Sequence, residues 1–345
     1  MLLGEEEMML NTMIKTKMRP FRLEDAKATV DLFNARSQNL YGWNDSTLDD
    51  MLNDWTAPGV DLEEVVRVVE DDQGNIIGYI DVYDLNKPHV VKYVWGFLHP
   101  DFWDEDLYND MLSWAEDCAR NRIRLAPDGT RVVIHHGSDS KEHRRNAAMR
   151  DYGYQLVRNY YRMMIEFDGE PQQPVIPEGL QIETIDIENE LQDALLALDD
   201  GFSDHYGHVE RSLDDMLKQW THYMESKKDF DPSLWFLAKD GGQIAGLCRN
   251  SSSMPEDPDM GWVNQLCVRK PWRRKGLGMA LLLTAFNEFY RRDKKRAGLG
   301  VDASSLTNAT RLYEKAGMHV TEKYDTYELE LRAGKDLMTK TLSKG

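Results

Sequence analysis

The residues best suited to chemistry lie in one basic, glycine-containing stretch, RRKGLGMALLLTAF, at positions 273–286. The preceding segment, WVNQLCV at 262–268, is rich in residues that favour strands. After the glycines, apolar side chains recur at the spacing of one helix face. The turn is therefore predicted to join a strand end to a helix start. The predicted helix face consists of Met279, Leu282, Leu283, Phe286 and Tyr290.

This turn has the properties of an anion site. The first turn of a helix has N–H groups without intrahelical partners, and the helix dipole adds partial positive charge there. Gly276 and Gly278 allow close approach of the backbone and a positive φ. Three adjacent cations occupy 273–275 in a chain of formal net charge −18. Phosphate or pyrophosphate fits these features, although a solvated basic turn fits them too. The Walker loop and the full dinucleotide fingerprint are absent from the sequence.

Arg273-x-x-Gly276-x-Gly278 resembles the pyrophosphate loop of the GNAT superfamily, the acyl-CoA-dependent N-acyltransferases. About thirty residues on, NATRLYEKAGM at 308–318 is similar to the second signature of that family. The intervening strand and the flanking hairpin follow in the order of the family. The resemblance is close over 180–331 and weak over 18–167, and the arrangement is most similar to that of tandem members.

The resemblance implies acetyl-CoA as co-substrate, without a metal. Its pyrophosphate would lie on the N–H groups of the turn, and its pantetheine would pair with the edge of the preceding strand. Asn308 would contact the pantetheine or acyl group, and Tyr313 would act on the departing sulfur as the catalytic residue. A helix N-cap is the plainer interpretation of Asn308, and a core aromatic that of Tyr313. The implied cofactor-binding residues are Leu266, Cys267, Val268, Arg273, Arg274, Lys275, Gly276, Leu277, Gly278, Met279 and Asn308.

The sequence leaves open which group takes a proton from the acceptor amine. Many family members carry a glutamate six residues before the valine that ends the strand. Trp262 occupies that position here and cannot act as a base. The backbone N–H of Val268 would stabilise the oxyanion of the tetrahedral intermediate. A water relay or an amine that arrives neutral would need no protein base. The candidate bases are Asp302, Asp259, His205 and His208.

A similar order of elements recurs on both sides of FDGEPQQPVIPEG (167–179), which holds three prolines and two glycines. Such a composition predicts a linker, taken as 168–179. Each side reads as a hairpin, a strand with a proline-bearing end, a helix, a strand, a helix ending in glycine and a final strand. We expect an α/β (α+β) fold of two tandem GNAT-like domains, 18–167 and 180–345, each a mixed, mostly antiparallel sheet flanked by helices. An irregular tail, 1–17, precedes them. Two unrelated α/β domains are the alternative.

The first half lacks the basic turn. When Pro100 is aligned with Pro271, the acids Asp104, Glu105 and Asp106 stand where the second half has cations and glycines. Like charges at ~4 Å repel by about 4 kcal/mol at an effective dielectric of ~20, so pyrophosphate should be excluded. Met149 also replaces the signature tyrosine. We expect a degenerate copy that serves as scaffold or as one wall of the acceptor site.

Composition narrows the functional classes. The chain is acidic, which argues against nucleic acid or an anionic membrane as partner. Apolar runs are shorter than the ~20 residues of a membrane helix, and the three cysteines are too dispersed for a disulfide framework or a zinc site. We expect a cytoplasmic N-acetyltransferase that acetylates a primary amine of a small molecule, with its site in the second half. A non-catalytic acyl-CoA sensor is the alternative, and the sequence does not give the oligomeric state.

Overall fold

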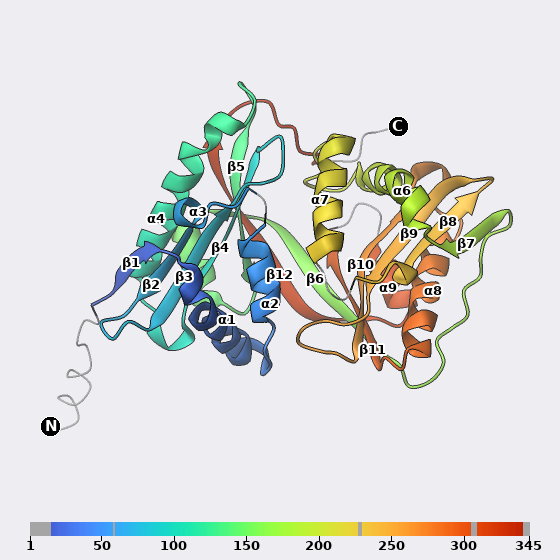
Figure 1. The fold of residues 1–345 in the computed structure, drawn as a ribbon, viewed down its shortest axis with the longest axis horizontal. Helices are drawn as coiled ribbons and strands as arrows, with labels where there is room; N and C mark the ends of the chain where they lie inside the picture. Colours follow the sequence, from blue (N-terminus) through green and yellow to red (C-terminus); the bar gives the residue numbers. More distant parts are fainter. Residues whose placement is uncertain (1–14, 58, 227–229, 305–308, 341–345) are drawn as a thin grey trace. The chain divides into compact units, whose positions relative to one another are not determined.

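The structure is a computed structural model, which describes residues 15–57, 59–226, 230–304 and 309–340. The chain forms two compact units (Figure 1). The N-terminal unit comprises Met1–Leu85 and Lys92–Arg122, and the C-terminal unit comprises Asn86–Val91 and Ile123–Gly345. None of the helices in the described ranges has the length and apolar character needed to cross a membrane. Most of the predicted tail, 1–17, lies outside the described residues.

The N-terminal unit is an antiparallel sheet in the order β1-β2-β3-β4 with helices around it. Phe33 of its first long helix packs edge-on against the ring of Tyr79, with centroids 4.9 Å apart. The strands are β1 (Lys17–Pro20), β2 (Val66–Glu70), β3 (Ile76–Tyr83) and β4 (Val91–Leu98). The helices are α1 (Ala26–Tyr41), α2 (Leu48–Trp55), α3 (Leu62–Val65) and α4 (Glu105–Asn121), with short 3-10 turns η1 (Leu23–Asp25) and η2 (Pro100–Phe102).

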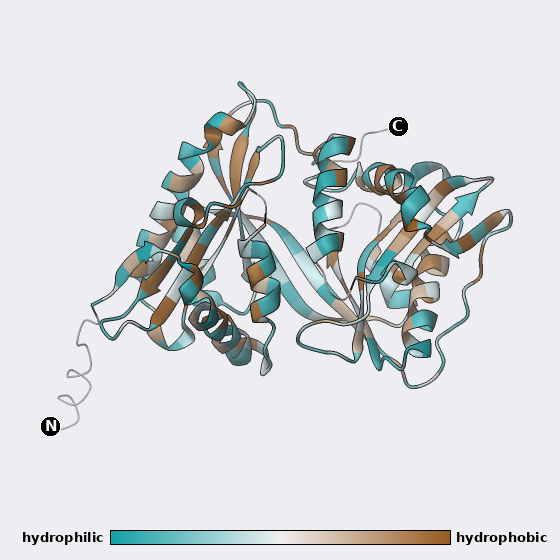
Figure 2. Ribbon diagram, in the orientation of Figure 1, coloured by the Kyte–Doolittle hydropathy of each residue, from teal (hydrophilic) through white to brown (hydrophobic). Residues whose placement is uncertain are grey.

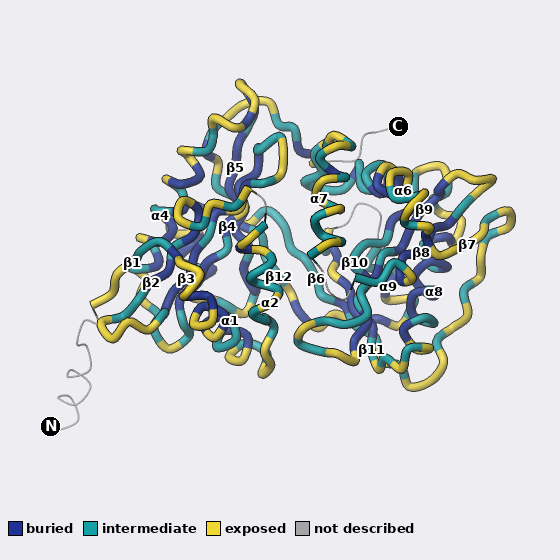
Figure 3. Tube along the Cα trace, viewed as in Figure 1, coloured by how far each residue is buried: buried dark blue, intermediate teal, exposed yellow. Residues whose placement is uncertain are grey.

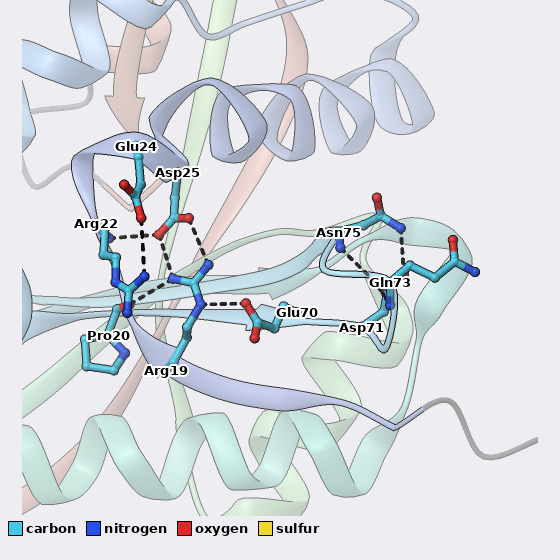
Figure 4. Close-up of polar contacts among 9 residues, drawn as sticks. All are labelled: Arg19, Pro20, Arg22, Glu24, Asp25, Glu70, Asp71, Gln73 and Asn75. Atoms are coloured by element: carbon cyan, nitrogen blue, oxygen red, sulfur yellow. Dashed lines mark hydrogen bonds and ion pairs between the residues drawn. The ribbon is translucent and has the colours of Figure 1, made fainter.

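Local polar contacts fix the outer strands of this unit (Figure 4). The guanidinium of Arg19 on β1 donates to both carboxylate oxygens of Asp25, at 2.7 and 2.8 Å, and to Glu70 of β2 at 2.6 Å. The carboxylate of Asp71 accepts from the backbone N–H of Asn75 at 2.8 Å. Gly74 takes φ 84° in the same turn. The predicted hairpin of the first half is therefore present between β2 and β3, with Gly74 in its turn.

The C-terminal unit has a sheet in the order β5-β12-β6-β11-β10-β9-β8-β7, in which β10 and β11 are parallel and the other six neighbouring pairs are antiparallel. Its strands are β5 (Val132–Asp139), β6 (Gln155–Glu166), β7 (Leu180–Thr184), β8 (Trp235–Asp240), β9 (Gln243–Ser251), β10 (Met260–Val268), β11 (Arg296–Asp302) and β12 (His319–Arg332). Its helices are α5 (His143–Tyr152), α6 (Ile187–Phe202), α7 (Leu213–Ser226), α8 (Leu277–Arg291) and α9 (Ala309–Lys315), with 3-10 turns η3 (Ile123–Leu125), η4 (Pro232–Leu234) and η5 (Lys270–Trp272).

The final strands of the two sequence halves are exchanged. β12, the last strand of the second half, lies between β5 and β6 of the first half. β6, the last strand of the first half, pairs with β11 of the second half. Glu328 of β12 reinforces the exchange, since its carboxylate accepts from Arg131 at 2.7 Å and lies 3.1 Å from His135 Nε2 on β5. The compact units therefore do not coincide with the sequence halves, and the division into domains 18–167 and 180–345 stays a prediction.

Two apolar layers cover the sheet of the C-terminal unit. One contains residues of α8 and α9 and includes Phe286 and Tyr313. The other contains residues of α6 and includes Leu198 and Cys267. Figure 2 shows hydrophobic residues along the strands, and Figure 3 shows β8 and β9 largely buried. The mixed, mostly antiparallel sheet with flanking helices is thus confirmed.

The buried face of α8 differs from the predicted stripe. Phe289 is fully buried, whereas Tyr290 is 39% exposed. Leu281, Leu282 and Leu283 are all buried in succession. Apolar residues surround most of this helix, so the spacing of a few of them did not define which side faces the sheet.

Candidate active site

The central feature of the candidate site is the point where β10 and β11 separate. Their parallel pairing runs from Met260 opposite Arg296 to Val263 opposite Leu299. In the described part of the chain it ends there, although β10 continues to Val268 and β11 to Asp302. The β9–β10 register shifts at the same place, between Val263 and Gln265. The last residues of β10 therefore have one edge that does not pair with β11.

The direction of the backbone groups on this edge follows from the antiparallel pairing with β9. The N–H of Arg269 donates to the carbonyl of Ala245 at 2.9 Å. Alternate residues of an antiparallel strand direct their N–H and C=O to the same side, so Cys267 faces β9. Leu266 and Val268 then direct theirs to the open edge. The Cys267 thiol is buried against α6, where a Cβ on Gly201 would be 2.6 Å from its Sγ.

The basic turn directly follows this edge and leads into α8. Gly276 is the N-cap of α8, with φ 89° and no side-chain cap. The first helical bond runs from Ala280 N–H to Gly276 C=O at 3.1 Å. The N–H groups of Leu277, Gly278 and Met279 precede that bond, and such groups have no intrahelical partner. Arg274 has φ 64°, a conformation uncommon for a residue with a side chain.

The three cations of the turn have different environments. Arg274 and Lys275 are exposed and form no ion pair with a residue that the structure describes. The guanidinium of Arg273 instead contacts both oxygens of Asp204, at 2.5 and 3.0 Å, and donates to the Val268 carbonyl at 2.8 Å. Burial raises the pKa of Asp204, but the hydrogen bond and charge of Arg273 outweigh it and lower that pKa. Arg273 is therefore held at the end of β10, with its charge compensated.

The helix α9 places Tyr313 near the same strand end. A Cβ on Gly278 would lie 3.1 Å from Leu312 Cδ1 and 3.7 Å from Val268 Cγ2, so the turn, α9 and β10 are in close contact. Tyr313 is 7% exposed, and burial raises the pKa of its hydroxyl well above the usual range. The phenol thus stays protonated at neutral pH. Asn308, predicted to precede this helix, lies outside the described residues.

The candidate bases lie in different places. Asp259 immediately precedes β10, whose nine residues at ~3.3 Å each put it about 30 Å from Val268. The carboxylate of Asp302 accepts from Arg158 at 2.8 and 3.0 Å. His208 Nε2 lies 3.2 Å from Asp199 Oδ1. His205 is half-buried next to Asp204. Asp259 is therefore too distant to serve a reaction at the end of β10.

In the N-terminal unit, the helix that corresponds to α8 is α4. Its N-cap is Asp104, whose carboxylate accepts from the N–H of Leu107 at 2.9 Å. Glu105 and Asp106 follow in its first turn. The chain's own acid thus occupies the position where α8 has Gly276, which agrees with the acidic replacement seen in the sequence.

Comparisons with known proteins define the class. The model of the acetyltransferase (GNAT) family matches residues 197–318, a range that contains β10, the basic turn, α8 and Tyr313. The crystal structure of a GCN5-related N-acetyltransferase from Sphaerobacter thermophilus is 30% identical, with TM-score 0.79, covering 93% of this chain and 98% of that one. The chain therefore belongs to the GCN5-related N-acetyltransferase (GNAT) family. It is an acyl-CoA-dependent acetyltransferase.

Two further proteins of the family are similar to this chain. A mycothiol acetyltransferase from Thermobispora bispora is 27% identical over 224 residues, which cover 64% of this chain and 70% of that protein. A tandem GNAT protein from the clavulanic acid biosynthesis pathway shares the fold at 13% identity, with TM-score 0.70 and coverage of 93% and 100%. The predicted resemblance to tandem members of the family is thereby confirmed.

Proposed function

We propose that this protein transfers an acetyl group from acetyl-CoA to a primary amine of a small molecule at the open edge of β10 in the C-terminal unit. The observation that carries the proposal is the end of β10–β11 pairing at Val263 and Leu299, directly before the uncapped N-terminus of α8. An unpaired strand edge can hydrogen-bond an extended ligand, and an uncapped helix start can bind its phosphates. Pantetheine and pyrophosphate are joined in that order in coenzyme A.

The residues present fit the co-substrate. The pyrophosphate would lie on the backbone N–H groups of 274–279, with the side chains of Arg274 and Lys275 as additional cations. The pantetheine would lie along the open edge of β10, where its amides can pair with the outward-facing backbone groups of Leu266, while the Val268 carbonyl on that edge accepts from Arg273. Cys267 would line the strand without such a bond, and Arg273 would shape the turn through Asp204. Asn308 keeps its proposed contact with the pantetheine or acyl group.

The chemistry required of the chain is modest. A neutral amine attacks the thioester carbonyl, and negative charge develops on the carbonyl oxygen. The Val268 N–H at the open edge would stabilise that oxygen, an interaction that strengthens as charge develops. Tyr313 would donate a hydrogen bond to the departing sulfur, because its phenol remains protonated.

A small-molecule acceptor is supported by the Thermobispora bispora relative, which is named for such an activity. The N-terminal unit would not hold a second coenzyme A, because Asp104 caps α4 with a carboxylate. We therefore propose one acetyl-CoA per chain. The unit would serve as scaffold or contribute to acceptor binding.

Reversal of the two exposed cations should weaken acetyl-CoA binding. The attraction between each cation and the pyrophosphate is worth about 1 kcal/mol at ~4 Å in water. Loss of both attractions in Arg274→Glu/Lys275→Glu should therefore raise the Kd for acetyl-CoA by at least about 30-fold at low salt. The ratio of variant to wild-type Kd should fall as salt is added, since screening shortens such interactions. Isothermal titration calorimetry at two ionic strengths measures both effects.

The matched control for this experiment is Arg124→Glu/Arg144→Glu, which changes net charge equally at two exposed cations elsewhere in the C-terminal unit. Its Kd should remain close to that of the wild type. Equal weakening in both double variants would show that only the overall charge matters, and an unchanged Kd in the turn variant would remove the turn from the binding site.

A further inference from the structure

We propose that His205 is the general base of the acetyl transfer, taking a proton from the ammonium group of the acceptor between the separated ends of β10 and β11. The inference rests on the proposed function and names the group that performs one of its steps. It follows from the way in which the loop after α6 is fastened to both strands.

The residue before His205 is tied to the end of β10. Asp204 is 3% exposed, and both of its oxygens contact the guanidinium of Arg273. The same guanidinium donates through Nε to the carbonyl of Val268, the last residue of β10, at 2.8 Å. A further bond joins it to the carbonyl of Gly201, at the end of α6, at 3.0 Å. Asp204 is thus held beside the proposed thioester position.

The residue after His205 is tied to the end of β11. The guanidinium of Arg158 lies over the ring of Tyr206, with its central carbon 4.3 Å from the ring centroid. Arg158 in turn donates to Asp302, the last residue of β11, at 2.8 Å. Residues 204 and 206 are thus linked, through Arg273 and Arg158, to the ends of β10 and β11, and His205 stands between these two residues in the chain.

The His205 imidazole is available for proton transfer. Its ring packs edge-on against Phe202, with centroids 4.5 Å apart. Neither ring nitrogen forms a hydrogen bond with a residue that the structure describes, and neither is among the buried side-chain atoms without a partner. The other candidates are engaged, Asp302 with Arg158 and His208 with Asp199.

The surroundings favour the neutral imidazole, the form that accepts a proton. Burial is the largest influence and lowers the pKa of His205. The charged and titratable groups that act on it are Asp204 and Asp302, which raise that pKa, and Arg273 and His208, which lower it. A base with a pKa below neutrality is unprotonated at pH 7 and can accept a proton in each cycle.

One ammonium proton passes to a ring nitrogen of His205, which leaves a neutral amine and an imidazolium. The amine nitrogen forms a bond to the thioester carbon, and the carbon–sulfur bond then breaks. The second proton of the attacking nitrogen passes to the thiolate as coenzyme A leaves. The imidazolium returns its proton to water, so one proton is released per amide formed.

The test compares two acceptors that differ in their need for a base. Hydroxylamine is largely neutral at pH 7, whereas a primary alkylamine such as n-butylamine is almost fully protonated. His205→Gln should lower kcat/KM for butylamine by about 100-fold at pH 7, the lower end of the range for general-base catalysis. Transfer to hydroxylamine, corrected for the reaction without enzyme, should be nearly unchanged. Release of coenzyme A is measured by thiol titration.

The pH profile gives a second readout. Without the base, kcat/KM for butylamine should keep rising toward the amine pKa, near ~10.4 for a lysine-like amine, whereas the wild-type profile levels off earlier. His208→Gln is the matched control, and its profile should follow that of the wild type. Acetyl-CoA affinity, measured by calorimetry, should be equal in all three proteins.

Each outcome decides the proposal. Selective loss with butylamine supports it. Equal loss with both acceptors would assign His205 a structural role, and retention of both activities would remove it from the mechanism. A wild-type protein that binds acetyl-CoA but acetylates neither amine would contradict the proposed amine transfer itself, and with it the inference.

Discussion

Tyr313→Phe is expected to lower kcat about 100-fold while leaving the affinity for acetyl-CoA nearly intact, which is the lower end of the effect of an acid–base group. The hydroxyl is buried, and its raised pKa keeps it protonated. Proton transfer from such a phenol to a thiolate is uphill, because the thiol that forms is the stronger acid, with a pKa near ~8.5. The hydroxyl should therefore act mainly as a hydrogen-bond donor to the sulfur as negative charge develops there.

The measurement is single-turnover acetyl transfer to hydroxylamine, combined with calorimetric titration of acetyl-CoA. Tyr290→Phe is the matched control, because Tyr290 lies on α8 with 39% of its surface exposed. It should behave as the wild type. If Tyr313→Phe has an unchanged single-turnover rate, Tyr313 is a core aromatic without a role in catalysis.

The second large effect concerns stability. Asp204→Ala should reduce the free energy of unfolding by about 3 kcal/mol, because it leaves Arg273 without its buried partner. Asp204 is 3% exposed, and its carboxylate also positions the loop that carries His205. Because its pKa is lowered in the folded protein, its contribution is present above its unfolded pKa, near ~3.9. That contribution disappears as the pH falls further through the folded value.

Asp200, in the last turn of α6, offers a nearby control for Asp204, which lies in the loop after that helix. Asp200 pairs with Arg269 at 2.5 Å, but its side chain is 44% exposed. Asp200→Ala should therefore cost at most about 1 kcal/mol, the usual value of a surface pair. Urea denaturation at pH 7 compares the two variants. Equal losses would mean that burial of Asp204 adds nothing to the interaction.

Local features of this chain were predictable from the sequence. The basic turn, its glycines and the strand before it follow from propensity and spacing, and they lie in the predicted order at β10 and α8. The acids at the start of α4 were also predicted, because the alignment of Pro100 with Pro271 places them there, whereas the cap formed by Asp104 was not. The hairpin at Gly74 follows from the same kind of local information.

Long-range features were not predictable in this way. The exchange of β6 and β12 depends on which strands pair across more than a hundred residues, and both strands carry similar local patterns. The role of Asp204 was missed for the same reason, since Arg273 is 69 residues away. Its neighbour His205 was one of four candidate bases, and the sequence did not distinguish it from the other three. The opposite charges of Asp204 and Arg273 could have suggested an ion pair, but their spacing in the sequence does not show that they are in contact.

The most direct test of the central proposal is a crystal structure of the full chain with acetyl-CoA. The predicted result is one coenzyme A per chain, with its pyrophosphate on the N–H groups of 274–279 and its thioester beside Val268. His205 should lie on the open side of that thioester. Coenzyme A bound at the N-terminus of α4, or two molecules bound per chain, would contradict the assignment of the site to the open edge of β10.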